Sequence, residues 1–194
     1  LRRQRQMCIR DSSYDPITAG AFAQFGFPEH LKCELVHGII RRRNDRTPAQ
    51  AKISSNVLTN LRSKLRGTDR RPYGFDTGVR VTDTDVRYPD VSVCYDSSAT
   101  HCREVPRVLT DPIVIIEVCS GSTGRFDETA KLGQYRHLPS LDTIVFVDPE
   151  AETARVVQRL GPQSWRDDLF AQPHDVMLPA LDLTIPHTEI FARD

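Results

Sequence analysis

The chain has 194 residues with 26 basic and 26 acidic side chains, so its formal net charge is zero and the totals show no strongly basic, DNA-coating surface. Hydrophobic residues make up 39%, enough for a folded core, but no apolar run is long enough to cross a bilayer and no leader resembles a secretory signal. The five cysteines form no CxxC pair; they are Cys8, Cys33, Cys94, Cys102 and Cys119. Their odd number and wide spacing predict free thiols and a cytoplasmic protein, and we expect no membrane partner.

Residues 1–12 read LRRQRQMCIRDS and lack the periodicity of a helix or a strand. The run MCIRDS matches the translation of a transposase adapter used in DNA library preparation, so we expect this segment to be non-native or disordered; the alternative is a genuine basic arm. We expect residues 13–194 to form a single domain. Without the four arginines and one aspartate of the segment, that domain carries 22 basic and 25 acidic residues, so nucleic-acid binding would require a local site.

The first half of the domain combines helices with short strands. Residues 17–25 predict a short helix with Thr18 as its N-cap, and the alternating residues 31–43 predict a hairpin that turns at Gly38. The run Thr47-Pro48-Ala49-Gln50 contains an N-cap, a proline at the first helical position and a capping-box glutamine. It predicts a long helix that ends near Gly67.

The second half is richer in strands. Residues 73–82 and 86–95 predict an antiparallel hairpin, followed by a polar loop over 97–110. The aliphatic run 113–118 predicts a central strand buried on both faces, and residues 125–138 predict a helix. The remaining expected elements are strands at 143–147, 154–160 and 175–183 and a helical turn within 186–192. This order predicts an α/β or α+β fold, with one sheet flanked by helices.

Three charged residues lie within or next to segments that are otherwise expected to be buried. Glu117 follows the aliphatic run 113–116, where a buried and unpaired carboxylate would be costly. Asp90 stands at the start of an alternating strand, and Lys131 lies on the helix that returns towards the end of the Glu117 strand. Each residue also has a purely structural alternative. Glu117 could reach solvent at the strand end, Asp90 could lie on a solvated outer face of the sheet, and Lys131 could form a surface ion pair with Asp127.

Two carboxylates from adjacent strands and a lysine form a set suited to phosphodiester hydrolysis. Carboxylate oxygens are preferred ligands of Mg²⁺, which can polarise a phosphodiester and lower the pKa of bound water. Lys131 would orient that water or stabilise negative charge in the transition state. Glu34 could complete the metal shell, although its position alone favours the exposed face of a hairpin strand.

Four sequence pieces occur in order, with the capped helix between the first and the second: Glu34-Leu35-x-x-Gly38, Pro89-Asp90-Val91-Ser92-Val93, Glu117-Val118-Cys119-Ser120-Gly121-Ser122-Thr123 and Asp127-x-x-x-Lys131-x-x-x-Tyr135. Together they resemble the Uma-type restriction endonuclease family of the PD-(D/E)XK nuclease superfamily. The resemblance covers roughly residues 18–183.

The resemblance implies a restriction-endonuclease-like fold, which is a mixed central β-sheet flanked by helices, and a catalytic site that uses Mg²⁺ or Mn²⁺. By motif position it implies that Asp90 and Glu117 are catalytic metal ligands and that Glu34 is the family's N-terminal glutamate, near the metal. The superfamily's usual lysine would fall at Cys119. The family instead takes its catalytic lysine from the following helix, which here is Lys131.

The implied function is that of a metal-dependent endonuclease that hydrolyses DNA phosphodiester bonds. The sequence does not decide whether the protein acts as a monomer or as a homodimer. The chain departs from the family pattern at His37, where aspartate is common, at Gln50, near a frequent histidine, and at Gly121, which replaces a proline. The alternatives are a non-catalytic nucleic-acid-binding or regulatory protein that retains the fold, and hydrolysis of RNA or another phosphodiester. The basic residues between positions 41 and 71 could form a DNA-contacting stripe or only a solvated face.

Overall fold

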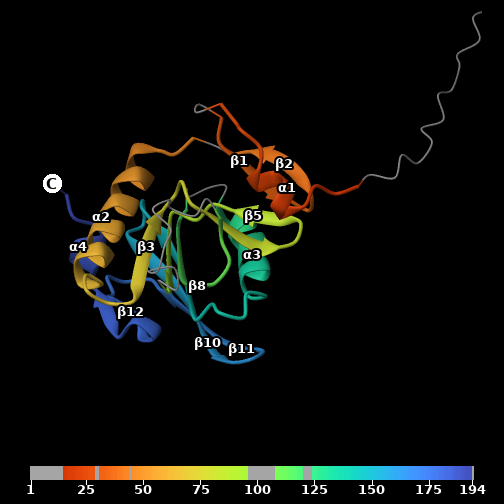
Figure 1. The fold of residues 1–194 in the computed structure, drawn as a ribbon. Coiled ribbons are helices and arrows are strands. Elements are labelled where there is room, and N and C mark those ends of the chain that lie inside the picture. Colours follow the sequence, from red (N-terminus) through yellow and green to blue (C-terminus); the bar gives the residue numbers. More distant parts are fainter. Residues whose placement is uncertain (1–14, 29–30, 44, 96–107, 120–123, 194) are drawn as a thin grey trace, which may run out of the picture.

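The computed structural model describes residues 15–28, 31–43, 45–95, 108–119 and 124–193, with the backbone alone for 124–127 (Figure 1). The helices are α1 (Ala19–Ala23), α2 (Pro48–Lys64), α3 (Gly124–Tyr135) and α4 (His187–Ile190), with a 3-10 turn at Pro179–Leu181. The strands are β1 (Cys33–Val36), β2 (Ile39–Arg42), β3 (Arg70–Gly74), β4 (Gly78–Thr82), β5 (Asp85–Arg87), β6 (Val91–Tyr95), β7 (Val108–Leu109), β8 (Pro112–Val118), β9 (Thr143–Asp148), β10 (Thr153–Gly161), β11 (Ser164–Phe170), β12 (Val176–Leu178) and β13 (Leu183–Ile185). The expectations for residues 1–12 and for most of the loop 97–110 lie outside the described residues.

A six-stranded sheet in the order β11-β10-β9-β8-β6-β3 forms the centre of the fold. Every residue of β8 is buried, which confirms the predicted central strand. β8 pairs parallel with β9 and antiparallel with β6, so the sheet is mixed. The parallel connection from β8 to β9 contains α3, as such crossovers require a long link between the two strands.

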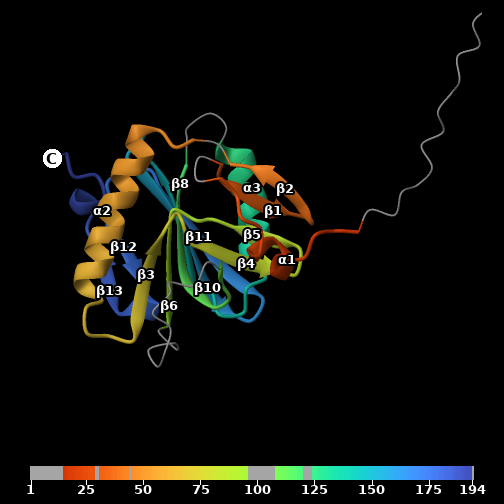
Figure 2. The ribbon, with the colours of Figure 1, turned by 45° about the horizontal axis from the view of Figure 1, so that its top comes forward.

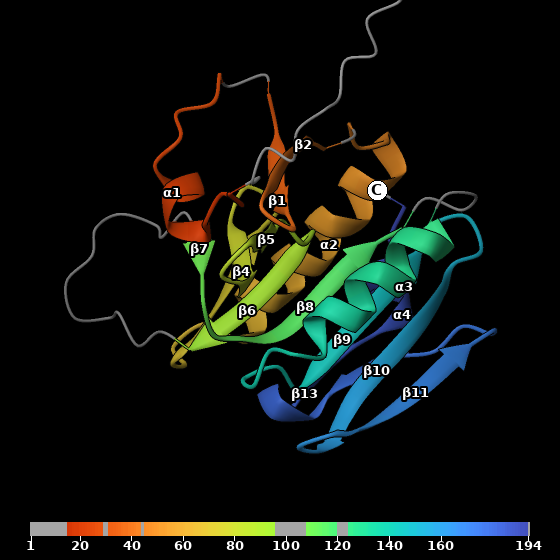
Figure 3. The ribbon, with the colours of Figure 1, turned by 90° about the vertical axis from the view of Figure 1, so that its right-hand side faces the viewer.

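The two long helices lie on opposite faces of this sheet (Figure 3). Ile116 packs in the same core as Leu61 of α2, whereas Ile115 packs in the same core as Leu132 of α3. Because side chains alternate along a strand, Glu117 lies on the same side of β8 as Ile115, facing α3. No helix within the described ranges is long and apolar enough to span a membrane.

The local signals that begin α2 and turn the first hairpin are confirmed. The hydroxyl oxygen of Thr47 accepts a hydrogen bond from the backbone N–H of Gln50, and the Gln50 side chain accepts one from the N–H of Thr47. The hairpin between β1 and β2 turns at His37 and Gly38, whose φ angles are 50° and 72°. Glycine adopts the second of these without a Cβ clash, and a Cβ at this position would collide with Pro16, which explains the residue at the turn.

The chain changes sheets at Tyr88-Pro89-Asp90. β5 belongs to a five-stranded sheet in the order β2-β1-β5-β4-β7, whereas β6 belongs to the six-stranded sheet (Figure 2). The predicted antiparallel pairing of residues 73–82 with 86–95 is confirmed, since β3 pairs with β6 and β4 with β5. The expectation of two continuous strands is wrong, because each is divided between the two sheets. Pro89 has no N–H to continue a ladder, which suits the break. The five-stranded sheet packs on α1 through Phe22.

Two more differences lie near the C-terminus. The predicted strand 175–183 is divided into β12 and β13 by the turn Pro179–Leu181, and the two strands pair with each other. Strand β11 was not predicted, because its sequence SWRDDLF is mostly polar, as an edge strand allows. The mixed central sheet and its flanking helices are as expected, but the prediction of one sheet is wrong, because β1, β2, β4, β5 and β7 form a second sheet and β12 and β13 a third.

Candidate active site

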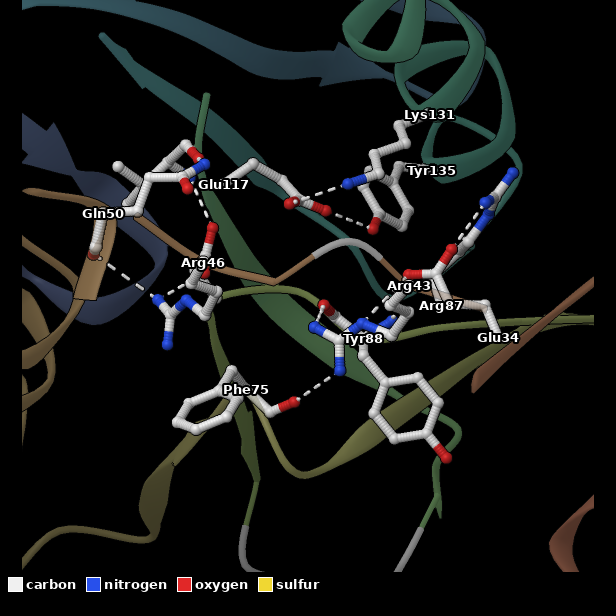
Figure 4. A network of polar contacts seen from close by, with 12 residues as sticks. Glu34, Arg43, Arg46, Gln50, Phe75, Arg87, Tyr88, Glu117, Lys131 and Tyr135 are labelled. Atoms are coloured by element: carbon white, nitrogen blue, oxygen red, sulfur yellow. Dashed lines mark hydrogen bonds and ion pairs between the residues drawn. The ribbon is translucent and has the colours of Figure 1, made fainter. Parts of the chain in front are cut away.

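Glu117 lies near the end of β8 and is only 4% exposed. Its Oε1 atom accepts a hydrogen bond of 2.6 Å from the hydroxyl of Tyr135, and its Oε2 atom is 3.0 Å from Nζ of Lys131 (Figure 4). Lys131 and Tyr135 are four residues apart on α3, so one face of the helix presents both side chains to the strand. The structure thus brings Lys131 to Glu117; the side chain of Asp127 lies outside the described residues.

The surroundings of Glu117 disfavour its negative charge. Burial raises the pKa of Glu117 above its ordinary value; the Lys131 ammonium opposes this rise, and the negative Asp90 adds to it. Burial and the neighbouring Glu117 charge also raise the pKa of Tyr135 well above its ordinary value, so its hydroxyl remains a donor at neutral pH. A further positive charge near Glu117 would therefore stabilise the carboxylate.

Asp90 is held next to Glu117 by the strand register. The antiparallel pairing of Val91 with Ile116, continued by one residue, places Asp90 opposite Glu117. The Oδ2 atom of Asp90 accepts a 2.6 Å hydrogen bond from the backbone N–H of Val118. Asp90 is buried, so the alternative of a solvated outer face is wrong.

Arg46 is one of two arginines of the site that sequence reasoning missed, the other being Arg87; Arg46 entered only as part of the basic stripe. Its Nη2 atom lies 2.5 Å from Oδ1 of Asp90 and also contacts the hydroxyl of Ser54. The guanidinium carbon lies 4.4 Å from the centre of the Phe75 ring. The one signal available was its place directly before the capping box, because the start of α2 opens onto the site.

Gln50 also contributes more than its capping role. Its Nε2 atom donates a 2.9 Å hydrogen bond to the backbone carbonyl of Val118, while its Oε1 atom completes the capping box. The side chain therefore fastens the first turn of α2 to the end of β8, where Glu117 lies (Figure 4). A helix cap that is also a tertiary contact fixes the position of Arg46 relative to the two carboxylates.

Glu34 is held by arginines at another part of the site. Its Oε2 atom lies 2.8 Å from Nη1 of Arg87, and its Oε1 atom lies 3.6 Å from Nε of Arg43. Its side chain is 13% exposed, so the exposed-strand alternative is wrong. Among the described residues, however, no group of three or more His, Cys, Asp and Glu is arranged to hold a metal ion. Glu34, the expected third metal ligand, is thus not grouped with Asp90 and Glu117; its carboxylate pairs with Arg87 and Arg43 instead.

The four predicted site residues nevertheless line one pocket of about 1110 Å³: Glu34, Asp90, Glu117 and Lys131. Its walls are the β1–β2 hairpin, the start of α2, the end of β8 and one face of α3. Among the described lining residues, six are Lys or Arg and five are Asp or Glu, so the charges nearly cancel. A bound divalent cation would make the pocket clearly positive, which suits a phosphate group.

The basic stripe predicted between positions 41 and 71 is divided by the structure. Arg43 and Arg46 lie within the pocket, and the exposed Arg41 and Arg42 line it from the hairpin. The other exposed members lie on or after α2, away from the lining: Lys52, Arg62, Lys64, Arg66 and Arg71.

The residues at the end of β8 fit a small divalent cation. Mg²⁺ is commonly held by one or two protein carboxylates, with waters and substrate phosphates as the other ligands, so Asp90 and Glu117 suffice. Cys119 is a poor ligand for such a cation, because Mg²⁺ prefers oxygen to sulfur. Burial, assisted by the negative charges of Glu117 and Glu128, raises the pKa of its thiol to about 12, and a protonated sulfur binds metal poorly.

A solved structure shares this architecture over most of the chain. A crystal structure described as "a putative nuclease belonging to DUF820" from Anabaena variabilis matches with a TM-score of 0.73 and 20% identity, over 91% of this chain and 98% of that chain, which shows a common fold. The uncharacterized protein sll1609 of Synechocystis sp. is 31% identical over 78 residues, which are 40% of this chain and 44% of that protein. The match thus spans less than half of that relative.

The family comparison covers more of the sequence than the curated relative does. The Uma2 family, described as "Putative restriction endonuclease", matches residues 20–186. This range includes Asp90, which directly precedes β6, the strand that carries Glu117 and the helix that carries Lys131. The chain therefore belongs to the Uma2 family, which confirms the resemblance inferred from its motifs and supports a nuclease function.

Proposed function

We propose that this protein is an endonuclease that hydrolyses DNA phosphodiester bonds with Mg²⁺ or Mn²⁺ held by Asp90 and Glu117. The observation that carries the proposal is the placement of two buried carboxylates side by side, Asp90 directly before β6 and Glu117 on the adjacent strand β8, with Lys131 at 3.0 Å from Glu117. The Uma2 family description supports DNA as the substrate.

The residues divide the chemical work. A divalent cation at Asp90 and Glu117 would polarise the phosphodiester and lower the pKa of a bound water. Lys131 contacts Glu117 from α3, and its ammonium would stabilise the negative charge that develops on the phosphate. Tyr135 holds the other oxygen of Glu117, so the carboxylate keeps one orientation. These side chains are mostly or fully buried, which strengthens each electrostatic interaction.

Glu34 has a positioning role in this proposal. Its carboxylate orients Arg87 and Arg43, which line the same pocket, and thereby fixes positive charge at the side where the β1–β2 hairpin forms the wall. Arg41 and Arg42 extend this positive charge along the exposed strand β2. A nucleic-acid backbone that crosses the pocket would contact these arginines on its way to the carboxylates.

The test is cleavage of supercoiled plasmid, single-stranded DNA and RNA in Mg²⁺, in Mn²⁺ and in EDTA. The wild type should cut DNA only with a divalent cation. Glu117→Gln should lose cleavage, while Glu128→Gln should keep it, since Glu128 lines the same pocket but pairs with Arg155 of β10 at 2.6 Å. Cleavage of RNA alone would change the substrate class. A folded wild type that binds the cation but cuts nothing would favour a non-catalytic protein that retains the fold.

A further inference from the structure

We propose that Arg46 is an internal counter-ion that takes the place of the divalent cation at Asp90 and transfers to a substrate phosphate when the cation binds. The cation and the phosphodiester in this inference rest on the proposed function. The inference adds a residue with two alternating partners to a site otherwise defined by Asp90, Glu117 and Lys131.

The two oxygens of Asp90 differ in their availability. Oδ2 accepts the backbone N–H of Val118, a contact that also fixes the carboxylate on the end of β8. Oδ1 accepts no hydrogen bond from the backbone, and it is the atom that Arg46 contacts through Nη2 at 2.5 Å. A divalent cation on Oδ1 would lie only a few ångströms from the guanidinium, so the two positive charges repel each other. We therefore expect binding of the cation at Oδ1 to displace Arg46.

The remaining contacts of Arg46 suit a group that can move. Its interactions with Asp90, Ser54 and the carbonyl of Gln50 are all made by the single atom Nη2. Its Nε atom is buried and has no hydrogen-bond acceptor among the described residues. Arg87 differs, because its Nε and Nη1 atoms bond two separate partners. A buried donor without an acceptor is costly, and a phosphate oxygen would remove that cost.

The structure also indicates where the guanidinium would go. It rests on the ring of Phe75, an apolar surface along which a planar group can turn without losing its stacking contact. Arg46 lines the pocket together with Asp90, Glu117 and Lys131, so a turn away from Asp90 keeps it within the same space. The fork of an arginine side chain matches the oxygens of a phosphate group.

The first experiment measures Mn²⁺ binding by calorimetry without nucleic acid. Arg46→Met keeps an unbranched apolar side chain on Phe75 but removes the charge, so Mn²⁺ should bind about tenfold more tightly. The control is Arg41→Met, which removes an exposed pocket arginine from β2 and should change the affinity by less than about twofold, because water and salt screen its charge. Unchanged or weaker Mn²⁺ binding by a folded Arg46→Met protein would overturn the inference.

A second measurement uses the wild type and so does not depend on the folding of a variant. The Nε–H resonance of Arg46, assigned by ¹⁵N NMR, should shift when Mg²⁺ saturates the protein and shift again when a short duplex DNA is added. A resonance that stays unchanged at saturating Mg²⁺ would show that Arg46 stays on Asp90, against the proposal.

The transfer to phosphate is tested in a Lys131→Ala background with Mg²⁺, in which cleavage should not interfere. Adding Arg46→Met should weaken binding of a short duplex at least about fivefold and reduce the salt dependence by about one phosphate contact. Equal affinity with and without Arg46 would overturn the transfer. If the wild type cuts no substrate, the proposed function fails, whereas the Mn²⁺ titration still decides whether Arg46 competes with the cation.

Discussion

The hydrogen bond from Tyr135 to Glu117 gives a stability prediction whose size follows from the structure. Tyr135 is fully buried, and its hydroxyl lies 2.6 Å from Oε1 of Glu117. Tyr135→Phe keeps the packing of the ring and removes only this donor. Because the acceptor is a charged group in a buried position, the free energy of unfolding should fall by about 1.5–3 kcal/mol.

Urea denaturation at pH 7 in EDTA measures this loss, and a double-mutant cycle shows whether the bond to the charge is responsible. In a Glu117→Gln background the acceptor is neutral, so the same Tyr135→Phe change should cost only about 0.5–1.5 kcal/mol. The reasoning would be refuted if Tyr135→Phe lowered the free energy by less than about 0.5 kcal/mol, or if the loss were equal in both backgrounds.

Three more predictions test other parts of the account. Lys131→Ala should still bind Mn²⁺ but lose DNA cleavage. Lys131→Arg should restore cleavage only in part, because the planar fork of arginine does not replace the compact ammonium of lysine. Full activity of Lys131→Ala in single-turnover assays would contradict the role of Lys131. Gly38→Ala should lower the free energy of unfolding by about 2 kcal/mol or more, since φ is +72° and the new Cβ would lie 2.2 Å from Cβ of Pro16; an unchanged denaturation midpoint would contradict this. Cys33 and Cys94 are buried free thiols, and burial raises the pKa of Cys94 to about 12. Both should therefore resist alkylation at pH 8 until the protein is denatured, which mass spectrometry would show.

The features that the sequence predicted correctly are those determined by nearby residues. The capping box at Thr47 and Gln50 depends on four consecutive positions, and the turn at Gly38 depends on one residue with a positive φ. The fully buried strand β8 was visible because a short aliphatic run without alternation suits only a central strand. Local chemistry of this kind does not require knowledge of the rest of the fold.

The features that the sequence did not predict depend on contacts between distant segments. Arg87 is paired with Glu34, which lies 53 residues earlier, and neither residue has a local pattern that indicates its partner. Arg46 meets Asp90 only because the chain changes sheets at Pro89 and α2 begins beside the end of β8. Asp90, Glu117 and Lys131 were found from their unusual positions and from the family resemblance, whereas the arginines that neutralise the site had no such signal.

The most direct test of the two-carboxylate cation site is a crystal structure of the protein soaked with Mn²⁺, with anomalous scattering recorded at the manganese edge. We expect a single strong peak within about 2.5 Å of one oxygen of Asp90 and one oxygen of Glu117, with Lys131 close by but not a ligand. Manganese bound elsewhere in the pocket, or bound through Glu34 without Asp90, would contradict the proposed site.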